Sequence, residues 1–444
     1  MSQHHVLVIG AGAAGLTAAI RAAEAGARVT LLNAHPKPGL KILMSGGTRC
    51  NVTHEKVTER DFFGGSRNVV ARILRAFNVK DTLDWFEDQL GVALKLEDTG
   101  KYFPLTDDAN TVLDALLREA ERAGVTLRTG ARVVRLTRVA NGWRAGIQRV
   151  RNASALGEGV VSTSQEEWTL PAVHPDEWEE ANAVVFATGG LSFPRSGTDG
   201  TGYALLTSLG HSMVPPFPAL VPLTSDDTLC AAAQGVTTDV ALTLHAAGAK
   251  PVKCEGSLLV THFGYSGPVA LDLSRHFAAA DPATRRVTCN FVPHANREWL
   301  LSDWLARAER ESARTVRRHL CNWLPDRLAC ELAWDAEVDP ARELPQVSRE
   351  RREALFRQLL ERDLRVTGTL GYEKAEVTAG GVPLSEVDAS TLESRVAPGV
   401  YLCGEVLDVE GRLGGFNFQW AWSSGTVAGR SAAKGRDAER EAAR

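Results

Sequence analysis

The sequence predicts an α/β fold, in which a parallel-sheet domain is divided along the chain by an inserted β domain and a small helical domain. Short apolar runs that lead directly into glycines occur near both ends of the chain, at 6–12, 183–190 and 400–404. Such runs are typical of parallel strands that are buried on both faces. After Pro215-Pro216 the pattern changes to short strands and turns, and from about 296 to charged helices. A chain of 444 residues is too long for one core, so two or three domains are expected.

We therefore assign residues 1–191 and 366–444 to the parallel-sheet domain, 192–295 to the inserted β domain and 296–365 to the helical insert. Return strands of the β domain are expected near 366–380. This division follows from the glycine-rich strand ends, because such turns line the crevice where open parallel sheets bind ligands.

The first expected element is a βαβ unit of about 30 residues. Val6–Ile9 is a buried strand, residues 16–25 form an Ala-rich helix closed by Gly26, and residues 28–32 form the second strand. The other expected elements are helices at 67–91, 108–124 and 417–433, a β-rich stretch over 125–173 with a turn at Asn141-Gly142, a surface excursion over 150–167, and strands at 183–187, 375–378 and 400–403.

Charge gives no general signal for nucleic-acid binding, since the net charge is −4. Arg and Lys cluster at 67–80, 307–318 and 349–365. Acidic residues are interleaved in most of these clusters, so solvated helix faces are the favoured interpretation, and a local basic face is the alternative.

The seven cysteines are odd in number, and none forms a Cys-x-x-Cys pair. A disulfide framework or a zinc site is therefore not expected, and no histidine cluster has the spacing of metal ligands. No apolar run is long enough to span a membrane, and the N-terminus does not resemble a signal peptide. We expect a cytoplasmic protein without a metal.

Gly10, Gly12 and Gly15 have the spacing of a dinucleotide-binding turn. The first glycine permits the tight turn after the strand, the second lets a diphosphate approach the backbone, and the third lets the helix pack on the strand. The N-terminus of the following helix then faces the phosphates with free N–H groups, and Ala13 and Ala14 of this turn are expected to bind the cofactor. The position between a strand and a helix is the context that supports this interpretation.

The acidic residue expected at the end of the second strand is replaced by Asn33. Two interpretations follow from the residues. One is FAD with a weaker contact to the ribose hydroxyls, because a neutral amide replaces the carboxylate. The other is NADP, with Lys37 or Lys41 near the 2′-phosphate.

Several segments, in order over nearly the whole chain, resemble a single family. They are Gly10–Gly15, Gly39–Thr53, Ala187–Tyr203, Thr261–Pro268, Val377–Val382, Gly404–Asp408 and Gly414–Gln419. As an ordered set they resemble the bacterial BaiN/YhiN-type FAD-dependent oxidoreductases, also called aminoacetone-oxidase-family flavoproteins. Two positions depart from the family pattern: Asn33 replaces the acid, and Thr48 stands where a further glycine is common.

The resemblance implies a Rossmann-like FAD-binding domain and FAD, rather than NADP, at the N-terminal site. NAD(P)H would act as a transient electron donor, since no second dinucleotide motif is present. Glu405 is expected to bind a ribityl or ribose hydroxyl, with a helix cap or surface carboxylate as the alternative. The expected cofactor-binding residues are Gly10, Gly12, Ala13, Ala14, Gly15, Asn33, Lys41, Ser45, Gly46, Gly47, Arg49, Asn51, Thr188, Gly189, Gly190, Gly404, Glu405, Gly414, Gly415, Phe416 and Asn417.

Three residues are candidates for catalysis. By resemblance, the loop that holds Arg49 and Cys50 lies beside the flavin ring. Cys50 is a candidate proton donor, with a buried structural thiol as the alternative. Arg49 is a candidate for binding an anionic or carbonyl group of the substrate, with an internal ion pair as the alternative. His262, and with it Tyr265, reaches the substrate if the inserted domain covers the crevice, whereas a lone histidine is otherwise structural.

Three functions follow. The leading one is an NAD(P)H-driven reductase of a carbon–carbon double bond conjugated with a carbonyl, in an enone-type small molecule or in a uridine of ribosomal RNA. The second is a flavin oxidase of a small amine such as aminoacetone. The third is a non-catalytic flavin-binding or RNA-binding factor. The expected partners are thus a small molecule or RNA, with no membrane and no metal.

Overall fold

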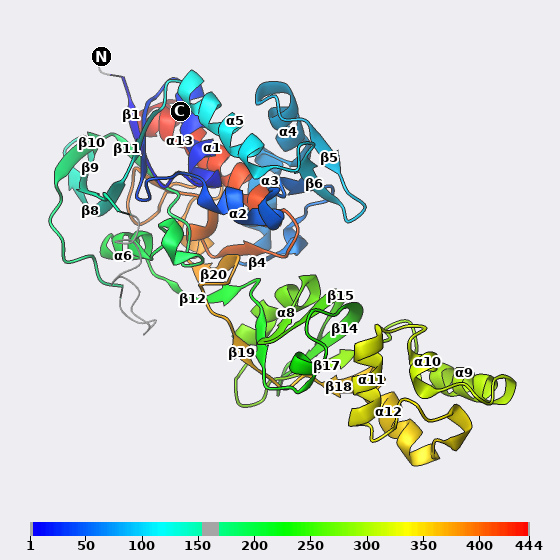
Figure 1. The fold of residues 1–444 in the computed structure, drawn as a ribbon. Helices are drawn as coiled ribbons and strands as arrows, with labels where there is room; N and C mark the ends of the chain where they lie inside the picture. The colour runs from blue at the N-terminus through cyan, green and yellow to red at the C-terminus, as the bar shows by residue number, and fades with distance from the viewer. Residues whose placement is uncertain (1–2, 153–167, 443–444) are drawn as a thin grey trace. The chain divides into compact units, whose positions relative to one another are not determined.

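The computed structural model describes residues 3–152 and 168–442, and most of the surface excursion expected over 150–167 lies outside them. The chain divides into two compact units (Figure 1). The first comprises Met1–Phe217 and Glu376–Arg444, and the second Pro218–Ala375.

Five parallel strands form the central sheet of the first unit, in the order β21-β11-β1-β2-β7. They are β1 (His5–Ile9), β2 (Arg28–Asn33), β7 (Thr126–Thr129), β11 (Ala183–Phe186) and β21 (Val400–Leu402). The strand order reverses at β1, because β2 and β7 lie on one side of it and β11 and β21 on the other. In open parallel sheets, ligands bind in the crevice at the carboxyl ends of the strands at such a reversal.

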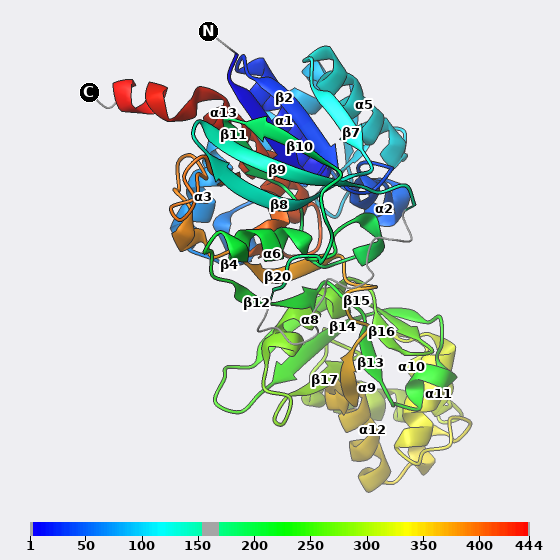
Figure 2. The same ribbon diagram turned by 90° about the vertical axis from the view of Figure 1, so that its left-hand side faces the viewer.

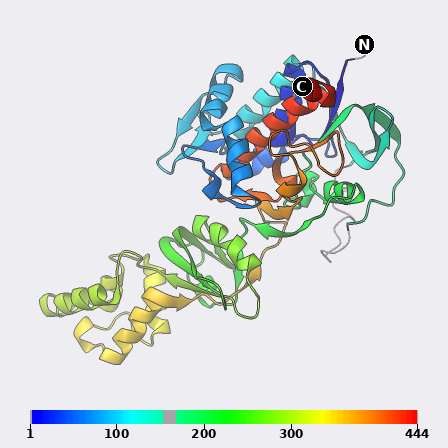
Figure 3. The same cartoon turned by 180° about the vertical axis from the view of Figure 1, so that it is seen from behind.

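Helices and a second sheet cover the two faces of this sheet. The helices α1 (Ala13–Glu24) and α13 (Phe416–Ala442) lie side by side (Figure 1), and Figure 3 shows α13, in red, from behind. The antiparallel strands β8 (Ala131–Val139), β9 (Gly142–Arg149) and β10 (Glu177–Ala181) lie across the other face (Figure 2). The strand β1 is therefore covered on both faces, and Val6, Leu7 and Val8 are fully buried.

The first unit contains further helices and short strands outside these two sheets. They are α2 (Leu40–Thr48), β3 (Thr53–His54), β4 (Phe62–Gly64), α3 (Arg67–Ala76), α4 (Val79–Asp84), β5 (Leu94–Leu96), β6 (Lys101–Pro104), α5 (Ala109–Arg122), α6 (Thr201–Ser208), β12 (Val214–Ala219), β20 (Val377–Gly381) and β22 (Val409–Gly411).

The second unit contains a seven-stranded antiparallel sheet in the order β18-β17-β14-β15-β16-β13-β19. The strands are β13 (Leu223–Ser225), β14 (Thr237–His245), β15 (Val252–Thr261), β16 (Gly264–Ser266), β17 (Arg286–Asn290), β18 (Arg362–Asp363) and β19 (Val366–Thr369). The helices are α7 (Leu229–Ala232), α8 (Pro268–Ala279), α9 (Arg297–Arg310), α10 (Val316–Leu320), α11 (Asp326–Asp335) and α12 (Arg349–Glu361).

The structure differs from the expected organisation in several places. Residues 192–217 belong to the first unit, because β12 pairs with β20 and α6 packs on β8. Residues 366–375 belong to the second unit, where β19 pairs with β13. Residues 296–365 share one buried apolar core with the strands of that unit instead of forming a core of their own.

Two helices also differ from expectation. The stretch over 67–91 is broken, because the side chain of Asn78 accepts a hydrogen bond from the N–H of Asp81 and starts a new helix, α4. The segment 268–279 was expected to contain strands and turns, but it forms α8, with Pro268 at the first helical position, where a missing N–H costs nothing.

Candidate functional site

The glycine turn after β1 has the geometry that its spacing predicts. Gly10 has φ +103°, and a Cβ there would lie 2.4 Å from the carbonyl oxygen of Ala187. A Cβ on Gly15 would lie 1.7 Å from the carbonyl oxygen of Gly10. These two glycines are therefore required for the turn and for the packing of α1 against β1 and β11.

Gly12 differs from Gly10 and Gly15, because a Cβ on Gly12 would meet no atom within 4 Å. Gly12 is the N-cap of α1, no side chain caps the helix, and the first turn carries no acidic residue. The N–H groups of Ala13 and Ala14 thus begin a helix whose positive end is open. This is the environment that a diphosphate group needs.

Asn33 lies at the carboxyl end of β2 and holds the glycine turn in place. Its Oδ1 accepts a hydrogen bond from the N–H of Ala11 at 3.1 Å. Its Nδ2 donates to the carbonyl oxygens of His35 at 2.6 Å and Lys37 at 3.2 Å. Both amide hydrogens are engaged within the protein, so only Oδ1 has capacity left, as an acceptor from a ribose hydroxyl.

The helices α1 and α13 are parallel and in very close contact. A Cβ on Gly425 would lie 2.6 Å from the carbonyl oxygen of Ala14, and one on Gly429 would lie 2.2 Å from that of Ala18. α13 begins nine residues before Gly425, whereas α1 begins one residue before Ala14. At 1.5 Å per residue, the start of α13 therefore lies roughly 12 Å beyond the start of α1.

This stagger places two positive helix ends along one line. The first is suited to a diphosphate and the second to a group about a dozen ångströms further on. In FAD, the ribityl chain joins the diphosphate to the ring over a separation of this kind. The first unit therefore fits FAD along the starts of α1 and α13.

The turn before α13 is held by Asn51. Gly414 and Gly415 have φ +127° and +91°. With the amide of Asn51 oriented to satisfy its neighbours, its oxygen accepts from the N–H of Gly415 at 3.0 Å, and its nitrogen donates to the carbonyl oxygen of Thr53 at 2.9 Å. A Cβ on Gly415 would lie 2.6 Å from the carbonyl carbon of Thr53. Asn51 thus joins the N-terminal loop to the start of the last helix.

The side chains of Phe416 and Asn417 make their contacts with other residues of the protein. The ring of Phe416 is 1 % exposed and stacks on His54, with ring centroids 4.8 Å apart. The side chain of Asn417 accepts from the N–H of Gly411 at 2.8 Å and donates to its carbonyl oxygen at 2.9 Å. Only the backbone N–H groups of these two residues are left to face a cofactor.

Lys41 and Glu405 form an ion pair between α2 and the turn after β21. Lys41 Nζ lies 2.9 Å from Glu405 Oε2 and donates to Ser192 Oγ at 2.6 Å. The carboxylate of Glu405 also accepts from Ser192 Oγ at 2.9 Å and from the N–H of Thr378 at 2.9 Å. Both partners are partly exposed, so their polar atoms can also meet a ligand.

The turns after the other central strands lie close to the same region. Gly404 packs against α1, because a Cβ there would lie 2.8 Å from Ala14 Cβ. A Cβ on Gly190 would lie 2.9 Å from Glu405 Oε1, and one on Gly189 would lie 2.8 Å from Thr198 Cγ2. Thr188 Oγ1 is buried and has no hydrogen-bond partner in the part of the chain that the structure describes.

Four of the six residues from Ser45 to Cys50 have left-handed backbone. Gly46 and Gly47 have positive φ, and so do Thr48, at +70°, and Cys50, at +63°. Ser45 Oγ donates to the carbonyl oxygen of Ile42 at 2.9 Å, which ends the regular part of α2. Thr48 therefore adopts a conformation that is costly for a β-branched residue.

The side chain of Cys50 is fully buried. Burial raises the pKa of its thiol to about 12, although a hydrogen bond with Ser45 acts in the opposite direction. A neutral thiol with so high a pKa is a weak proton donor. This environment supports the alternative of a buried structural thiol.

Arg49 is engaged by neighbouring side chains. Its guanidinium lies 2.6 Å from Glu97 and 3.3 Å from Asp107, and stacks over the ring of Phe103 at 3.9 Å from the centroid. The hydrogen bond to Glu97 raises the pKa of the guanidinium. The internal ion pair, which was the alternative for Arg49, is the arrangement present.

His262 and Tyr265 belong to the second unit. His262 is exposed, and its ring meets Phe263 edge-to-face. Tyr265 is fully buried, and its hydroxyl donates to Asp227 Oδ2 at 3.0 Å. The expectation that Tyr265 reaches a substrate is therefore wrong, whereas the role of His262 stays a prediction.

Sequence reasoning did not single out several residues that shape the site. Gly425 and Gly429 set the helix contact, and their four-residue spacing in a small-residue helix was the available signal. Ser192 and Thr378 hold Glu405. Gln419 is fully buried and accepts from Thr53 Oγ1 at 2.7 Å, but nothing in the sequence indicated this contact.

Fold and site together define a Rossmann-type flavoprotein, an FAD-dependent oxidoreductase. The family model described as the HI0933-like protein Rossmann domain matches residues 4–431, and the chain belongs to this family.

Two curated relatives are similar over almost their whole length. The 3-dehydro-bile acid delta(4,6)-reductase of Clostridium scindens is 33% identical over 96% of this chain and 98% of its own. The ribosomal RNA dihydrouridine synthase of Escherichia coli is 32% identical over 96% of each chain. Among solved structures, 3-ketosteroid-delta4-(5alpha)-dehydrogenase from Rhodococcus jostii RHA1 is 15% identical over 97% of both chains, with a TM-score of 0.48.

None of the helices within residues 3–152 and 168–442 combines the length and apolar character needed to cross a membrane. The same residues contain no group of three or more His, Cys, Asp or Glu side chains placed to hold a metal ion.

Proposed function

We propose that this protein uses NAD(P)H to reduce a carbon–carbon double bond conjugated with a carbonyl group. The observation that carries the proposal is the stagger of α1 and α13, which sets two open helix ends roughly 12 Å apart along one line. When bound there, FAD supplies hydride transfer between the nicotinamide and the substrate carbon.

The residues of the first unit have distinct roles in this proposal. The N–H groups of Gly12, Ala13 and Ala14 bind the diphosphate, since a Cβ is missing where it must approach. Asn33 Oδ1 accepts from the adenosine ribose. The ion pair of Lys41 with Glu405, in the turn after β21, offers polar atoms to the ribityl hydroxyls.

The start of α13 supports the redox chemistry. The N–H groups of Gly414, Phe416 and Asn417 point out of a helix end that bears partial positive charge. This charge stabilises the negative charge that gathers at the pyrimidine end of the ring. The side chains of Asn51 and Asn417 fix that end by hydrogen bonds to Gly415 and Gly411, so little reorganisation is needed during the reaction.

The names of the relatives support the type of reaction. A 3-oxo bile acid with double bonds at positions 4 and 6 and a uridine both hold a carbon–carbon double bond conjugated with a carbonyl. The same reaction saturates that bond in both molecules: hydride adds to the carbon remote from the carbonyl, and a proton adds to the carbon next to the carbonyl. His262 is the proposed proton donor, since the Cys50 thiol is buried.

The proposal also covers the electron donor and the cellular location of the protein. No second dinucleotide motif occurs in the sequence, so NAD(P)H binds transiently at the flavin ring. The seven cysteines are all unpaired, which supports the reducing environment of the cytoplasm.

The test begins with the purified protein and its visible spectrum in the absence of oxygen. NADPH is expected to bleach the flavin bands, and an enone or a uridine-containing RNA to restore them. Mass spectrometry should then show that the substrate has gained two hydrogen atoms. His262→Ala is expected to slow reoxidation by substrate while leaving bleaching by NADPH unchanged.

Two outcomes would contradict the proposal. A folded but colourless protein that does not take up added FAD would remove the flavin chemistry. Consumption of oxygen with a small amine, without any effect of NADPH, would establish the oxidase instead.

A further inference from the structure

Helix α3 carries positive charge that no ion pair within the described residues neutralises. Its residues include Arg67, Arg72 and Arg75 but no Asp or Glu. All three arginines are exposed, whereas Val70, Ile73 and Leu74 are buried on the opposite side of the helix. Within residues 3–152 and 168–442, no ion pair involves any of the three.

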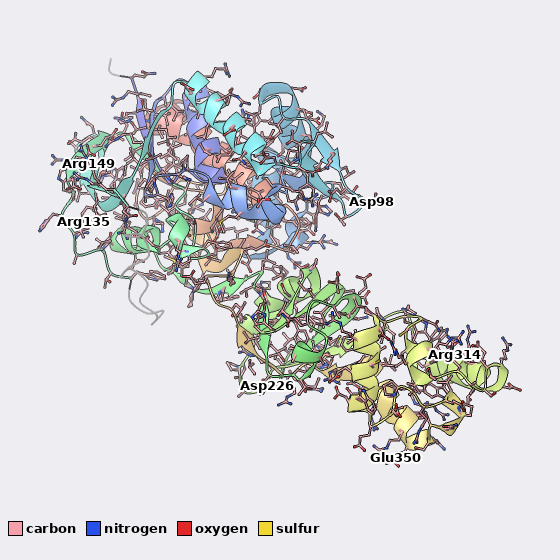
Figure 4. The ribbon with its side chains drawn as sticks, viewed as in Figure 1. Asp98, Arg135, Arg149, Asp226, Arg314 and Glu350 are labelled. Carbon is pink, nitrogen blue, oxygen red and sulfur yellow. The ribbon has the colours of Figure 1, made fainter. Side chains whose placement is uncertain are left out.

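The other arginine-rich helices are different. Arg307 and Arg314 both pair with Glu311, and Arg317 pairs with Asp326. Figure 4 shows Arg314 and Glu350 on the helical part of the second unit. Carboxylates are interleaved with the cations there, which favours the solvated-face interpretation for these helices, whereas the sequence of α3 contains no carboxylate.

The exposed face of α3 borders an open hollow of about 610 Å³. Asn68, Arg72, Arg75 and Ala76 line it. Their spacing of three and four residues places them on one side of the helix. The face thus combines two guanidinium groups and an amide, which are donors suited to phosphate oxygens.

α3 also lies next to the start of α13. The carbonyl oxygen of Phe77, the residue after α3, accepts from Gln419 Nε2 at 3.1 Å and from Ser423 Oγ at 2.6 Å. Gln419 is only three residues from the first residue of α13. The C-terminal end of α3 is therefore anchored to the first turns of α13, at whose start we propose that the flavin ring lies.

The chemistry of this face favours a polyanion with exposed bases. A small dinucleotide would need enclosed donors, whereas this hollow is open. A membrane-binding helix would expose large apolar side chains between its cations, but none of the exposed large apolar residues that the structure describes lies in α3. Arginine binds phosphate through two N–H groups and stacks on bases, which suits single-stranded or looped RNA.

We infer that the exposed face of α3, formed by Arg67, Asn68, Arg72 and Arg75, is a docking surface for the phosphate backbone of RNA. The inference deepens the proposed function and rests on it in one respect: it assigns uridine in RNA, rather than a free enone, as the substrate of the same site.

The test compares the wild-type protein with a double variant that carries both Arg72→Gln and Arg75→Gln. The matched control is the double variant Arg310→Gln with Arg327→Gln, which removes the same charge from exposed positions of the second unit. Binding of a labelled RNA hairpin with a uridine-rich loop is measured by fluorescence anisotropy at several salt concentrations. Flavin content and bleaching by NADPH are recorded for every protein.

The α3 variant is expected to bind the hairpin at least tenfold more weakly than wild type, with flavin content and bleaching unchanged. The slope of log affinity against log salt should fall by roughly 1.4, about 0.7 for each lost phosphate contact. The control variant should bind like wild type.

Equal loss in both variants, or no loss in the α3 variant, would overturn the assignment of α3. RNA would be overturned as the partner if the wild-type protein did not bind the hairpin, or if it bound only to vesicles containing phosphatidylserine. In either case, bleaching of the flavin by NADPH would still support the proposed redox function. If NADPH failed to bleach the flavin while RNA binding was intact, the result would count against the proposed function and leave the docking surface in place.

Discussion

The backbone of Ala14 lies directly against Gly425, so closely that a Cβ on the glycine would sit 2.6 Å from the Ala14 carbonyl oxygen. This contact joins a helix from the start of the chain to the helix at its end. It fixes the separation of the two helix N-termini at which we propose that the diphosphate and the flavin ring bind. The spacing of the proposed cofactor site therefore depends on Gly425, a residue that is given no contact with the cofactor, packed against the backbone of Ala14.

Gly425→Val is expected to destabilise the protein by about 1–3 kcal/mol, because the added side chain must force α13 away from α1. FAD affinity should fall together with stability, since the two helix ends lose their alignment. Urea unfolding and FAD titration check this, with Arg430→Val as the control for a valine elsewhere on the same helix. Wild-type affinity in Gly425→Val would show that the stagger does not set the site.

Gly12→Ala separates cofactor binding from folding. The new methyl group has open space around it, and the backbone of Gly12 is extended, with φ −84°. The melting temperature of the apoprotein should therefore stay unchanged. FAD affinity should fall at least tenfold, or about 1.4 kcal/mol, because the methyl group occupies the approach of the diphosphate.

The contrasting variant is Gly15→Ala, whose methyl group would lie 1.7 Å from the Gly10 carbonyl oxygen. It is expected to lower the melting temperature as well as FAD affinity. If Gly12→Ala kept full affinity, the diphosphate could not lie against this turn.

Thr48→Gly is expected to stabilise the protein. Thr48 has φ +70°, a conformation that costs a β-branched residue roughly 1–2 kcal/mol and glycine almost nothing. Part of the gain is offset by the greater freedom of glycine in the unfolded chain, so a net increase of about 0.5–1 kcal/mol is expected. Urea unfolding measures it. Thr99→Gly, at an exposed position without positive φ, should give no stabilisation, and a loss in both variants would count against strain at Thr48.

Cys50 is expected to resist alkylation in the folded protein. Its thiol is fully buried, and burial raises its pKa to about 12, so almost no thiolate forms at pH 8. Cys321 is the internal control, because it is exposed and should be modified first by iodoacetamide. Peptide mass spectrometry distinguishes the two. Rapid labelling of Cys50 in the native protein would show that its thiol is accessible and would restore it as a candidate proton donor.

Glu386 should contribute to stability against acid. Partial burial alone would raise the pKa of this carboxyl, but hydrogen bonds from Ser212 and His211 outweigh it and hold the pKa below its usual value. A group whose pKa is lower in the folded state stabilises the protein above the pKa of the unfolded state. That stability is lost as the pH falls through the folded pKa.

Glu386→Gln is therefore expected to be less stable than wild type at pH 6–7, with a difference that shrinks below about pH 4, near the ordinary pKa of glutamate. Urea unfolding at several pH values checks this. A difference that grows toward low pH would contradict the sign of the shift.

The parts of the site that depend on local spacing were predictable from the sequence. Gly10, Gly12 and Gly15 act within one turn, so their residue types and spacing were sufficient to predict it. The parts that depend on distant contacts were not predictable. Asn51 meets Gly415 and Lys41 meets Glu405, and in each case more than 350 residues separate the partners. Nothing local shows that the amide of Asn51 is used by a backbone N–H instead of a cofactor.

The organisation of the second unit was less predictable for a similar reason. Strands and turns over 192–295 and charged helices over 296–365 predicted two separate domains, but their apolar faces pack into one core. The buried ion pair of Arg362 with Asp227, at 2.7 Å, joins the end of the helical segment to the first strands. Its partners are ordinary charged residues in the sequence, and only the fold brings them together.

The pairing of the first and last helices also determines when the cofactor can enter. A nascent chain that has emerged from the ribosome only as far as residue 400 has the glycine turn and α1, but it lacks the helix that completes the binding groove. On the proposed placement of FAD, the site is complete only once α13 has emerged, and a chain truncated before Phe416 is expected to remain an empty apoprotein however much of the cofactor the cell contains.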